Sequence, residues 1–301
     1  MPRLLQPEQQ AAWQRDGFLV LPGFKSADAV AALRERARQI VEAFEPGPGP
    51  SVFSTRDQAR LAADRAFLDS ARGVHCFFEE EAFDEAGRLR QPKALSINKI
   101  GHALHDLDPV FDTFSRGPAL AALAQDLGLA QPLLVQSMLI FKQPAIGGEV
   151  RWHQDATFLH DEPVSVTGLW FALEDATRDN GCLWVQPGGH RGPLREIFER
   201  RSGESDGRGG RDDPDGPALA LRTLNPSPWP ELAQALPLEV PAGTLVCLHG
   251  LLPHWSAPNR SAHSRQAYTL HAVDARSRWS PANWLQADPA RPWRGFEAGP
   301  A

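Results

Sequence analysis

Cysteine is scarce in this 301-residue chain, and long hydrophobic runs are absent. The three cysteines, Cys76, Cys182 and Cys247, are far apart and form no CxxC pair. This spacing argues against a disulfide framework or a zinc knuckle and predicts three buried, reduced thiols. No apolar stretch reaches the length of about 18 residues that a membrane-spanning helix needs. Residues 1–8 (MPRLLQPE) also lack the apolar segment of a secretory signal, so we expect a cytoplasmic protein without a membrane partner.

Basic charge is limited as well. The net charge is −6 at pH 7, and no block of consecutive basic residues occurs. A nucleic-acid-binding face would need such a cluster, so we expect no nucleic-acid partner. Only four of the 31 basic residues are lysines, namely Lys25, Lys93, Lys99 and Lys142. Lysine is a compact point charge and arginine a planar fork, so each lysine retained in an arginine-rich chain is of interest.

The first part of the chain is predicted to be mainly helical. Apolar residues recur at three- and four-residue spacing over 26–44, and Ser26 is a suitable cap for this helix. A short apolar strand is predicted over 18–24, and the PGPGP sequence at 46–50 ends the helical segment. Another helix is predicted to begin at Pro118, because proline is favoured in a first turn.

After residue 130 the pattern changes to short segments rich in Val, Leu, Phe and Trp, separated by Pro, Gly and Asn turns. Strands are predicted over 133–142, 168–174, 181–186, 243–249 and 265–274. This pattern is typical of an all-β sandwich or barrel. We expect one domain over 1–301, in which a helical part (about 1–130) packs on a β core (about 131–286). The polar residues 202–217 interrupt this core, and we expect a mobile loop there.

His153 and Asp155 form the first candidate for chemistry. On an extended strand, residues two apart face the same side, so an imidazole and a carboxylate can meet at one point. Two histidines and one carboxylate, with three positions left open, are typical of non-haem iron(II) oxygenases. A His-x-Asp pair alone is common and is often only a hydrogen-bonded surface pair. The hypothesis therefore requires a second histidine.

Later histidines could supply that ligand: His190, His249, His254, His263 and His271. A 2-oxoglutarate co-substrate would also need a basic residue for its far carboxylate, ideally a bidentate arginine. An arginine eleven residues after the histidine would serve. Both His249 with Arg260 and His254 with Arg265 have this spacing, so spacing does not separate the two pairs.

Local context favours His254 with Arg265. Arg260 lies in a turn-like PNRS sequence that would face water, whereas Arg265 opens the predicted strand RQAYTLHAV. On that strand Arg265, Ala267, Thr269 and His271 would share one face, which suits a solvent-filled cavity.

The remaining histidines then receive other roles. We expect His249 to be structural and His190 to be a turn residue. His271 is expected to line the cavity or to pack beneath it.

Several segments resemble the phytanoyl-CoA dioxygenase family, over about residues 18–286. The core segments are WHQD at 152–155, GLWFALED at 168–175, NGCLW at 180–184, PGGH at 187–190 and the stretch 254–265. Further agreement comes from SINKIGHALH at 96–105, VQSM at 135–138, IFKQP at 140–144 and WSPANWLQ at 279–286. Two features depart from the family, namely Gly189, where serine is frequent, and the polar insertion at 202–217.

The resemblance implies a mainly β fold with flanking helices, built on a double-stranded β-helix (jelly-roll, cupin-like) core. It implies Fe(II) as the metal and 2-oxoglutarate and O₂ as co-substrates. The implied iron ligands are His153, Asp155 and His254. The implied 2-oxoglutarate pocket contains Arg265 at the far carboxylate, Ser256 beside it, and Lys99, Met138 and Trp170.

The sequence thus predicts an Fe(II)- and 2-oxoglutarate-dependent dioxygenase that hydroxylates a C–H bond of a small molecule and releases succinate and CO₂. One alternative is a non-catalytic 2-oxoglutarate or metal sensor. The other is a zinc hydrolase, because a His/His/Asp site can also hold zinc, but this leaves Arg265 and Lys99 without a role. A halogenase is disfavoured because it would need a small residue in place of Asp155. The sequence selects neither the substrate nor an oligomeric state.

Overall fold

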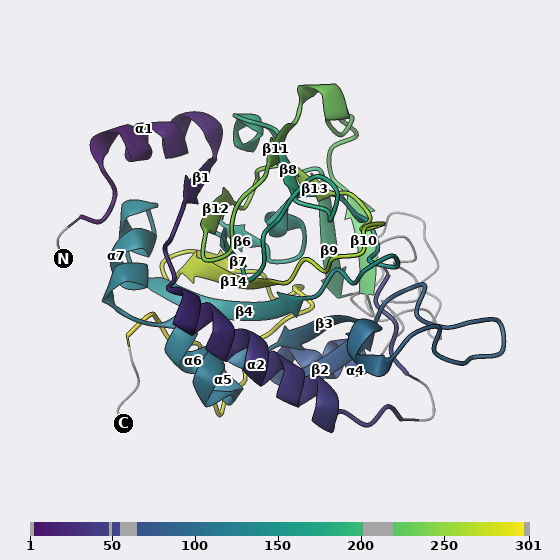
Figure 1. Ribbon diagram of the computed structural model, residues 1–301. Coiled ribbons are helices and arrows are strands. Elements are labelled where there is room, and N and C mark those ends of the chain that lie inside the picture. Colours follow the sequence, from purple (N-terminus) through teal and green to yellow (C-terminus); the bar gives the residue numbers. More distant parts are fainter. Residues whose placement is uncertain (1–2, 48–49, 55–64, 201–218, 298–301) are drawn as a thin grey trace, which may run out of the picture.

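The computed structural model describes residues 3–47, 50–54, 65–200 and 219–297, which form two facing antiparallel sheets with helices along one outer side (Figure 1). The polar insertion expected at 202–217 lies outside the described residues, as does part of the PGPGP segment.

The larger sheet has seven strands in the order β1-β12-β7-β14-β4-β3-β2, each antiparallel to its neighbours. β14 lies at its centre, between β7 and β4, and is buried along its whole length. The strand bounds are β1 (Phe18–Leu21), β2 (Val74–Phe78), β3 (Ile97–His102), β4 (Pro132–Ile140), β7 (Thr167–Ala172), β12 (Leu245–His249) and β14 (Ala267–Asp274).

The smaller sheet has four strands in the order β11-β8-β13-β5. These are β11 (Leu236–Leu238), β8 (Leu183–Val185), β13 (His254–Ser256) and β5 (Val150–His153). Two short pairs complete the strands: β9 (Glu196–Arg200) with β10 (Leu219–Thr223), and β6 (Asp161–Glu162) with β15 (Arg278–Trp279). Trp170 and Val246 of the larger sheet share one buried cluster with Leu183 and Val185 of the smaller sheet. Two antiparallel sheets packed in this way form the predicted jelly roll.

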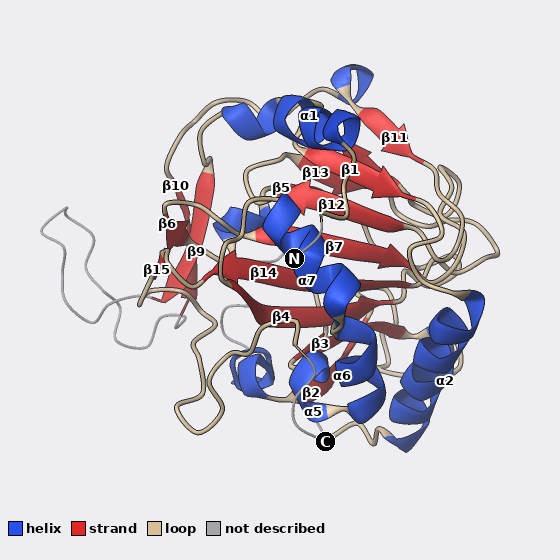
Figure 2. Cartoon of the chain, turned by 90° about the vertical axis from the view of Figure 1, so that its left-hand side faces the viewer, coloured by secondary structure: helices blue, strands red, loops and turns tan. Residues whose placement is uncertain are grey.

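Most helices cover the face of the larger sheet that points away from the smaller one, whereas the short helix Arg65–Asp69 places Phe67 on the cavity wall. Figure 2 shows the strands β12, β7, β14 and β4 side by side, with α2, α5 and α6 grouped beyond β4. The helices are α1 (Pro7–Asp16), α2 (Ala27–Ala43), α4 (Arg65–Asp69), α5 (Leu104–Leu107), α6 (Pro109–Ser115) and α7 (Pro118–Asp126). Among the described residues, none of these helices is long and apolar enough to cross a membrane.

Helix α2 follows directly from its sequence. The Ser26 hydroxyl accepts a hydrogen bond from the Ala29 backbone N–H at 3.2 Å, which satisfies one of the unpaired donors of the first turn. Val30, Leu33 and Val41 are buried at helical spacing against the sheet. Leu33 is fully buried, so its replacement by alanine should cost about 2–5 kcal/mol of stability. The predicted helix over 26–44 is confirmed.

The strand predictions after residue 130 are confirmed within a few residues, for example β4 for 133–142 and β14 for 265–274. The strand expected over 18–24 is shorter and ends at Leu21. Residues 1–130 also contribute β2 and β3, which the sequence pattern did not predict. β3 carries Asn98, Lys99 and Gly101, residue types that are poorly typical of strands. All three cysteines are free and buried, as predicted.

Candidate functional site

Three candidate metal ligands meet between the two sheets. His153 ends β5, and His254 begins β13 directly opposite it in the antiparallel pair. Oδ1 of Asp155 lies 3.8 Å from Nε2 of His153 and 3.6 Å from Nε2 of His254. The ligand atoms all lie within 4.8 Å of one another, and within the described part of the chain no other group of His, Cys, Asp and Glu does this. The extended backbone expected at Asp155 is wrong, because this residue begins a 3-10 turn (Asp155–Thr157).

Backbone carbonyls orient both imidazoles. Nδ1 of His153 lies 2.8 Å from the Arg151 carbonyl oxygen, and Nδ1 of His254 lies 3.0 Å from the Leu252 carbonyl oxygen. A carbonyl can only accept, so each Nδ1 carries the proton and donates it. Each Nε2 is then a free lone pair facing Asp155. Burial and the neighbouring His254 lower the pKa of His153 to about 3, which keeps this imidazole neutral.

Asp155 is the negative centre of the cluster. Burial favours its neutral form, but the facing histidines, His271 first among them, outweigh burial and hold the pKa of Asp155 below its usual value. Oδ1 lies 3.5 Å from Nε2 of His271, whereas Oδ2 is buried without a hydrogen-bond partner. We expected His271 either to line the cavity or to pack beneath it. Its position next to the Asp155 carboxylate is consistent with this expectation.

These donors fit a divalent metal ion. Oδ1 of Asp155 and the Nε2 atoms of His153 and His254 converge on one small volume. Mixed nitrogen and oxygen donors of this kind suit iron or zinc rather than calcium or magnesium. A cation bound there would offset the negative charge of the buried Asp155 carboxylate, which is otherwise costly to bury.

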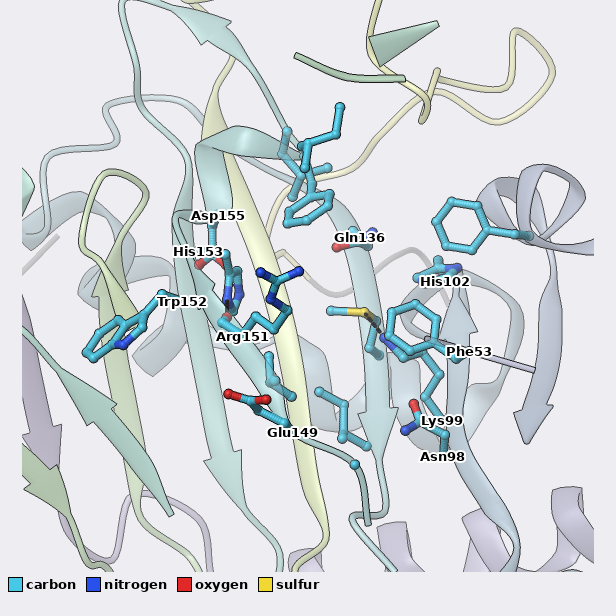
Figure 3. A pocket seen from close by; sticks show the side chains of 18 of the residues that line it. Phe53, Asn98, Lys99, His102, Gln136, Glu149, Arg151, Trp152, His153 and Asp155 are labelled. Atoms are coloured by element: carbon cyan, nitrogen blue, oxygen red, sulfur yellow. Dashed lines mark hydrogen bonds and ion pairs between the residues drawn. The ribbon is translucent and has the colours of Figure 1, made fainter. Parts of the chain in front are cut away.

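A cavity of about 430 Å³ opens beside the triad, between β5 on one side and β4 and β3 on the other (Figure 3). His153 and Asp155 form part of its wall, and Lys99 and Met138 face them from β3 and β4. Two of the three triad residues and two of the predicted pocket residues therefore line one cavity, and His254 lies behind His153 and Asp155.

Lys99 is a buried cation without an ion pair among the described residues. Its Nζ lies 3.2 Å from the centroid of the Phe53 ring and 3.8 Å from Sδ of Met138. Burial lowers the pKa of Lys99 to about 7, and the more distant Glu79 opposes this shift. Such a cation would be stabilised by an anion bound in the cavity.

Arg265, Trp170 and Ser256 are buried next to the cavity and do not belong to its wall. The Arg265 guanidinium is 5.4 Å from the Trp170 ring, and its Nε and Nη1 have no hydrogen-bond partner. Burial lowers the pKa of Arg265 to about 10. Trp170 pairs with Thr269, which pairs with Met138 on the cavity wall. The Ser256 hydroxyl donates to the Gly181 carbonyl oxygen at 2.9 Å. The face that carries Arg265 is thus drier than the solvent-filled cavity that we expected.

The other His/Arg pair lies elsewhere. The His249 ring is 5.9 Å from Trp13 and 5.1 Å from His190, in a contact between α1 and the turn at Gly189–Arg191. Arg260 is half exposed and forms an ion pair with Glu81 at 2.9 Å. The expected structural role of His249 and the turn position of His190 are consistent with these contacts.

Sequence reasoning missed several residues of the cavity. Gln136, His102 and Arg151 line it, as do the aromatic residues discussed below (Figure 3). One signal could have identified Arg151, because it lies two residues before His153 on the same strand and so faces the same side. His102 had no such signal, since it ends a strand that was not predicted.

The fold and the triad define a jelly-roll protein with a candidate metal site, and comparisons with known proteins show its family. Residues 13–267 match the family profile described as phytanoyl-CoA dioxygenase (PhyH), and the chain belongs to this family. Phytanoyl-CoA dioxygenase 1 of Oryza sativa subsp. japonica is 47% identical over 283 residues, covering 94% of each chain. Phytanoyl-CoA dioxygenase domain-containing protein 1 of Mus musculus is 44% identical over 296 residues, covering 96% of this chain and 97% of the mouse protein.

Solved structures share the fold at lower identity. The iron-bound structure of EctD from S. alaskensis has a TM-score of 0.62 and 20% identity, covering 99% of this chain and 88% of that chain. The carbocyclase SnoK from nogalamycin biosynthesis has a TM-score of 0.60 and 17% identity, covering 97% of this chain and 94% of that chain. As a member of its family, the chain is a 2-oxoglutarate-dependent dioxygenase, and its cofactor and co-substrates are iron, 2-oxoglutarate and O₂.

Proposed function

We propose that the protein hydroxylates a C–H bond of a small molecule in a reaction that consumes 2-oxoglutarate and O₂ and releases succinate and CO₂. The observation that carries this proposal is the group of His153, Asp155 and His254, whose free ligand atoms converge beside a cavity. Bound iron and 2-oxoglutarate would supply the oxidative chemistry, and the chain would supply binding, orientation and a dry environment.

His153, Asp155 and His254 would hold the iron. The carbonyls of Arg151 and Leu252 fix the two imidazoles with Nε2 toward the metal position. Such contacts behind metal ligands set the tautomer and the ring orientation. Three protein ligands would leave coordination positions of the metal open for the co-substrates.

Arg265 would bind the far carboxylate of 2-oxoglutarate, and Lys99 would be the second cation of that pocket. Arg265 has two buried N–H groups without partners, which a bidentate carboxylate would satisfy. Met138 and Trp170 would line the same pocket, with Ser256 beside Arg265. The zinc hydrolase hypothesis gives these two cations no task.

The cavity volume of about 430 Å³ supports a small-molecule substrate. The single domain, the cytoplasmic location, and the absence of nucleic-acid and membrane partners stay predictions from the sequence.

The test is succinate release by the purified protein with Fe(II) and 2-oxoglutarate, screened with a metabolite collection. We expect slow release without a substrate and faster release with the right one. Zinc in place of Fe(II) should give none. Hydrolysis of a substrate with zinc would favour the hydrolase, and the absence of succinate under all conditions, with 2-oxoglutarate bound, would favour the sensor.

A further inference from the structure

Two charged side chains of opposite sign face the cavity without a partner. Arg151 lies on β5 and Glu196 begins β9, and both line the cavity. Among the described residues, neither side chain forms an ion pair or a hydrogen bond, with the other or with a third group. Arg151 is exposed and Glu196 is partly buried, so both charges stay available to a ligand that enters the cavity beside the proposed metal ligands.

Arg151 is placed for contact with a molecule near the metal position. It lies two residues before His153 on β5, and the two side chains therefore project to the same side. Figure 3 shows the Arg151 side chain extending from β5 into the space toward the strands that carry Gln136 and Lys99. Trp152, between them, stacks on Trp255 with ring centroids 6.3 Å apart.

The other charged groups of the cavity already have contacts or roles. Asp155 and Lys99 belong to the proposed metal and 2-oxoglutarate sites. The remaining groups are Glu79 (which accepts from Asn98 and Gly148), Glu80 (which accepts from Ser54), Glu149 (which accepts from Trp255) and Lys142 (which donates to the Gly148 carbonyl). Arg151 and Glu196 are therefore the two charged residues of the cavity wall that have no other assigned contact or role.

The electrostatics of Glu196 favour a cationic ligand. Burial raises the pKa of Glu196, and the Arg151 guanidinium opposes this shift without touching the carboxylate. A carboxylate that has lost part of its water without gaining a contact is stabilised by a positive group brought to it.

The walls indicate the rest of the ligand. Phe53, Phe67, Phe158, Trp229 and Trp284 line the cavity, which suits an apolar or aromatic body. One arginine can bind a carboxylate through two parallel hydrogen bonds, and its single charge balances the single charge of that group. The cavity of about 430 Å³ must also admit 2-oxoglutarate, so the substrate is small.

We propose that Arg151 and Glu196 select the substrate, with Arg151 binding a carboxylate and Glu196 a protonated amine, so that the molecule hydroxylated is a small zwitterion. This inference rests on the proposed function, because it concerns the substrate of the same cavity. It adds two specificity-determining residues that lie outside the metal and 2-oxoglutarate sites.

The test measures binding of four matched probes to the protein loaded with Fe(II) and 2-oxoglutarate under nitrogen. The probes are phenylalanine (zwitterion), 3-phenylpropanoate (anion), 2-phenylethylamine (cation) and 2-phenylethanol (neutral), with phenyl phosphate as a further anion. Calorimetric titration gives Kd for the wild type, Arg151→Gln and Glu196→Gln. Arg178→Gln is the matched control, because Arg178 pairs with Glu239 at the surface at 3.0 Å. Saturating 2-oxoglutarate keeps the anionic probes out of its own site.

We expect phenylalanine to bind most tightly in the wild type. Arg151→Gln should raise the Kd of phenylalanine and of 3-phenylpropanoate by about tenfold or more and change the Kd of 2-phenylethylamine little. Glu196→Gln should raise the Kd of phenylalanine and of 2-phenylethylamine and change the Kd of 3-phenylpropanoate little. Arg178→Gln should change none of these Kd values. Equal effects on charged and neutral probes, tighter binding of phenyl phosphate than of 3-phenylpropanoate, or no binding of the zwitterion at millimolar concentration would overturn the proposal. The 2-oxoglutarate titration of the wild type, made first, tests the proposed function separately.

Discussion

A methyl group on Gly168 would lie 2.6 Å from Oδ2 of Asp155. Gly168 is on β7, in the larger sheet, and Asp155 approaches it from the turn after β5. The carboxylate therefore occupies the space that a side chain on this strand would fill. A glycine is required at position 168 because the Asp155 carboxylate, the proposed metal ligand, lies so close to this strand.

Gly168→Ala should displace Asp155 and weaken iron binding by about tenfold or more, comparable to losing a group that supports a metal ligand. The added methyl group should also cost about 1–3 kcal/mol of stability, since the strand cannot move without disturbing β14 and β12. Fe(II) titration and thermal unfolding check the two effects. Gly47→Ala should change neither, because among the described residues no atom beyond its chain neighbours lies within 4 Å of the added carbon. Unaltered iron affinity in Gly168→Ala would contradict the close approach of Asp155 to Gly168.

His271→Asn should weaken iron binding by about 10- to 100-fold without abolishing it, because His271 contacts Asp155 at 3.5 Å and is not one of the proposed ligands. At saturating Fe(II) the variant should still form succinate from 2-oxoglutarate. His254→Ala should not be rescued by excess iron. Equal losses in the two variants at saturating iron would mean that His271 is itself a ligand.

Arg265→Met should raise the KM for 2-oxoglutarate by about 10- to 100-fold, which is the usual cost of losing a charge-assisted pair. The same change should leave the unloaded protein as stable or more stable, because it removes a buried cation that has no ion pair among the described residues and whose Nε and Nη1 lack hydrogen bonds. Kinetics with varied 2-oxoglutarate and thermal unfolding measure these effects. Arg260→Met, at the half-exposed ion pair with Glu81, should leave the KM unchanged. If only Arg260→Met raised the KM, the 2-oxoglutarate pocket would have to be reassigned to Arg260.

The affinity for 2-oxoglutarate should fall as the pH rises above 7. Burial lowers the pKa of Lys99 to about 7, so Lys99 is charged and attracts a carboxylate below that pH and loses its charge above it. Wyman linkage then predicts that Kd rises with pH, approaching about tenfold per pH unit for one proton. Calorimetric titration between about pH 6 and 9 measures this slope. Lys99→Met should bind more weakly at low pH with a flatter profile, and an unchanged profile would remove Lys99 from the pocket.

Much of the fold and the metal-ligand candidates could be predicted from sequence because the signals are local. Ser26 and the apolar residues that follow at helical spacing determine α2 within one segment. His153 and Asp155 are two residues apart. The polarity of the neighbouring residues favours His254 with Arg265 over His249 with Arg260. The family resemblance supplied the rest of the candidate set.

What the sequence did not indicate depends on contacts between distant segments. β3 contains polar residues and glycine, and it is a strand because β2 and β4 hydrogen bond to it on both sides. His271 lies on β14, and Asp155 lies in a turn more than 100 residues earlier in the chain, so their contact forms only in the folded protein. The burial of Arg265 follows from the packing of both sheets, which a one-dimensional pattern does not contain.

The central claim is that His153, Asp155 and His254 together hold one iron ion. Its most direct test is the iron content of the protein after anaerobic loading with Fe(II) and removal of loosely bound metal. The control is Asp288→Ala, because Asp288 pairs with Arg291 at 3.3 Å and does not line the cavity. The wild type and this control should retain one iron per chain. Asp155→Ala should retain almost none while unfolding at a similar temperature. Full iron retention by a folded Asp155→Ala variant would contradict the account.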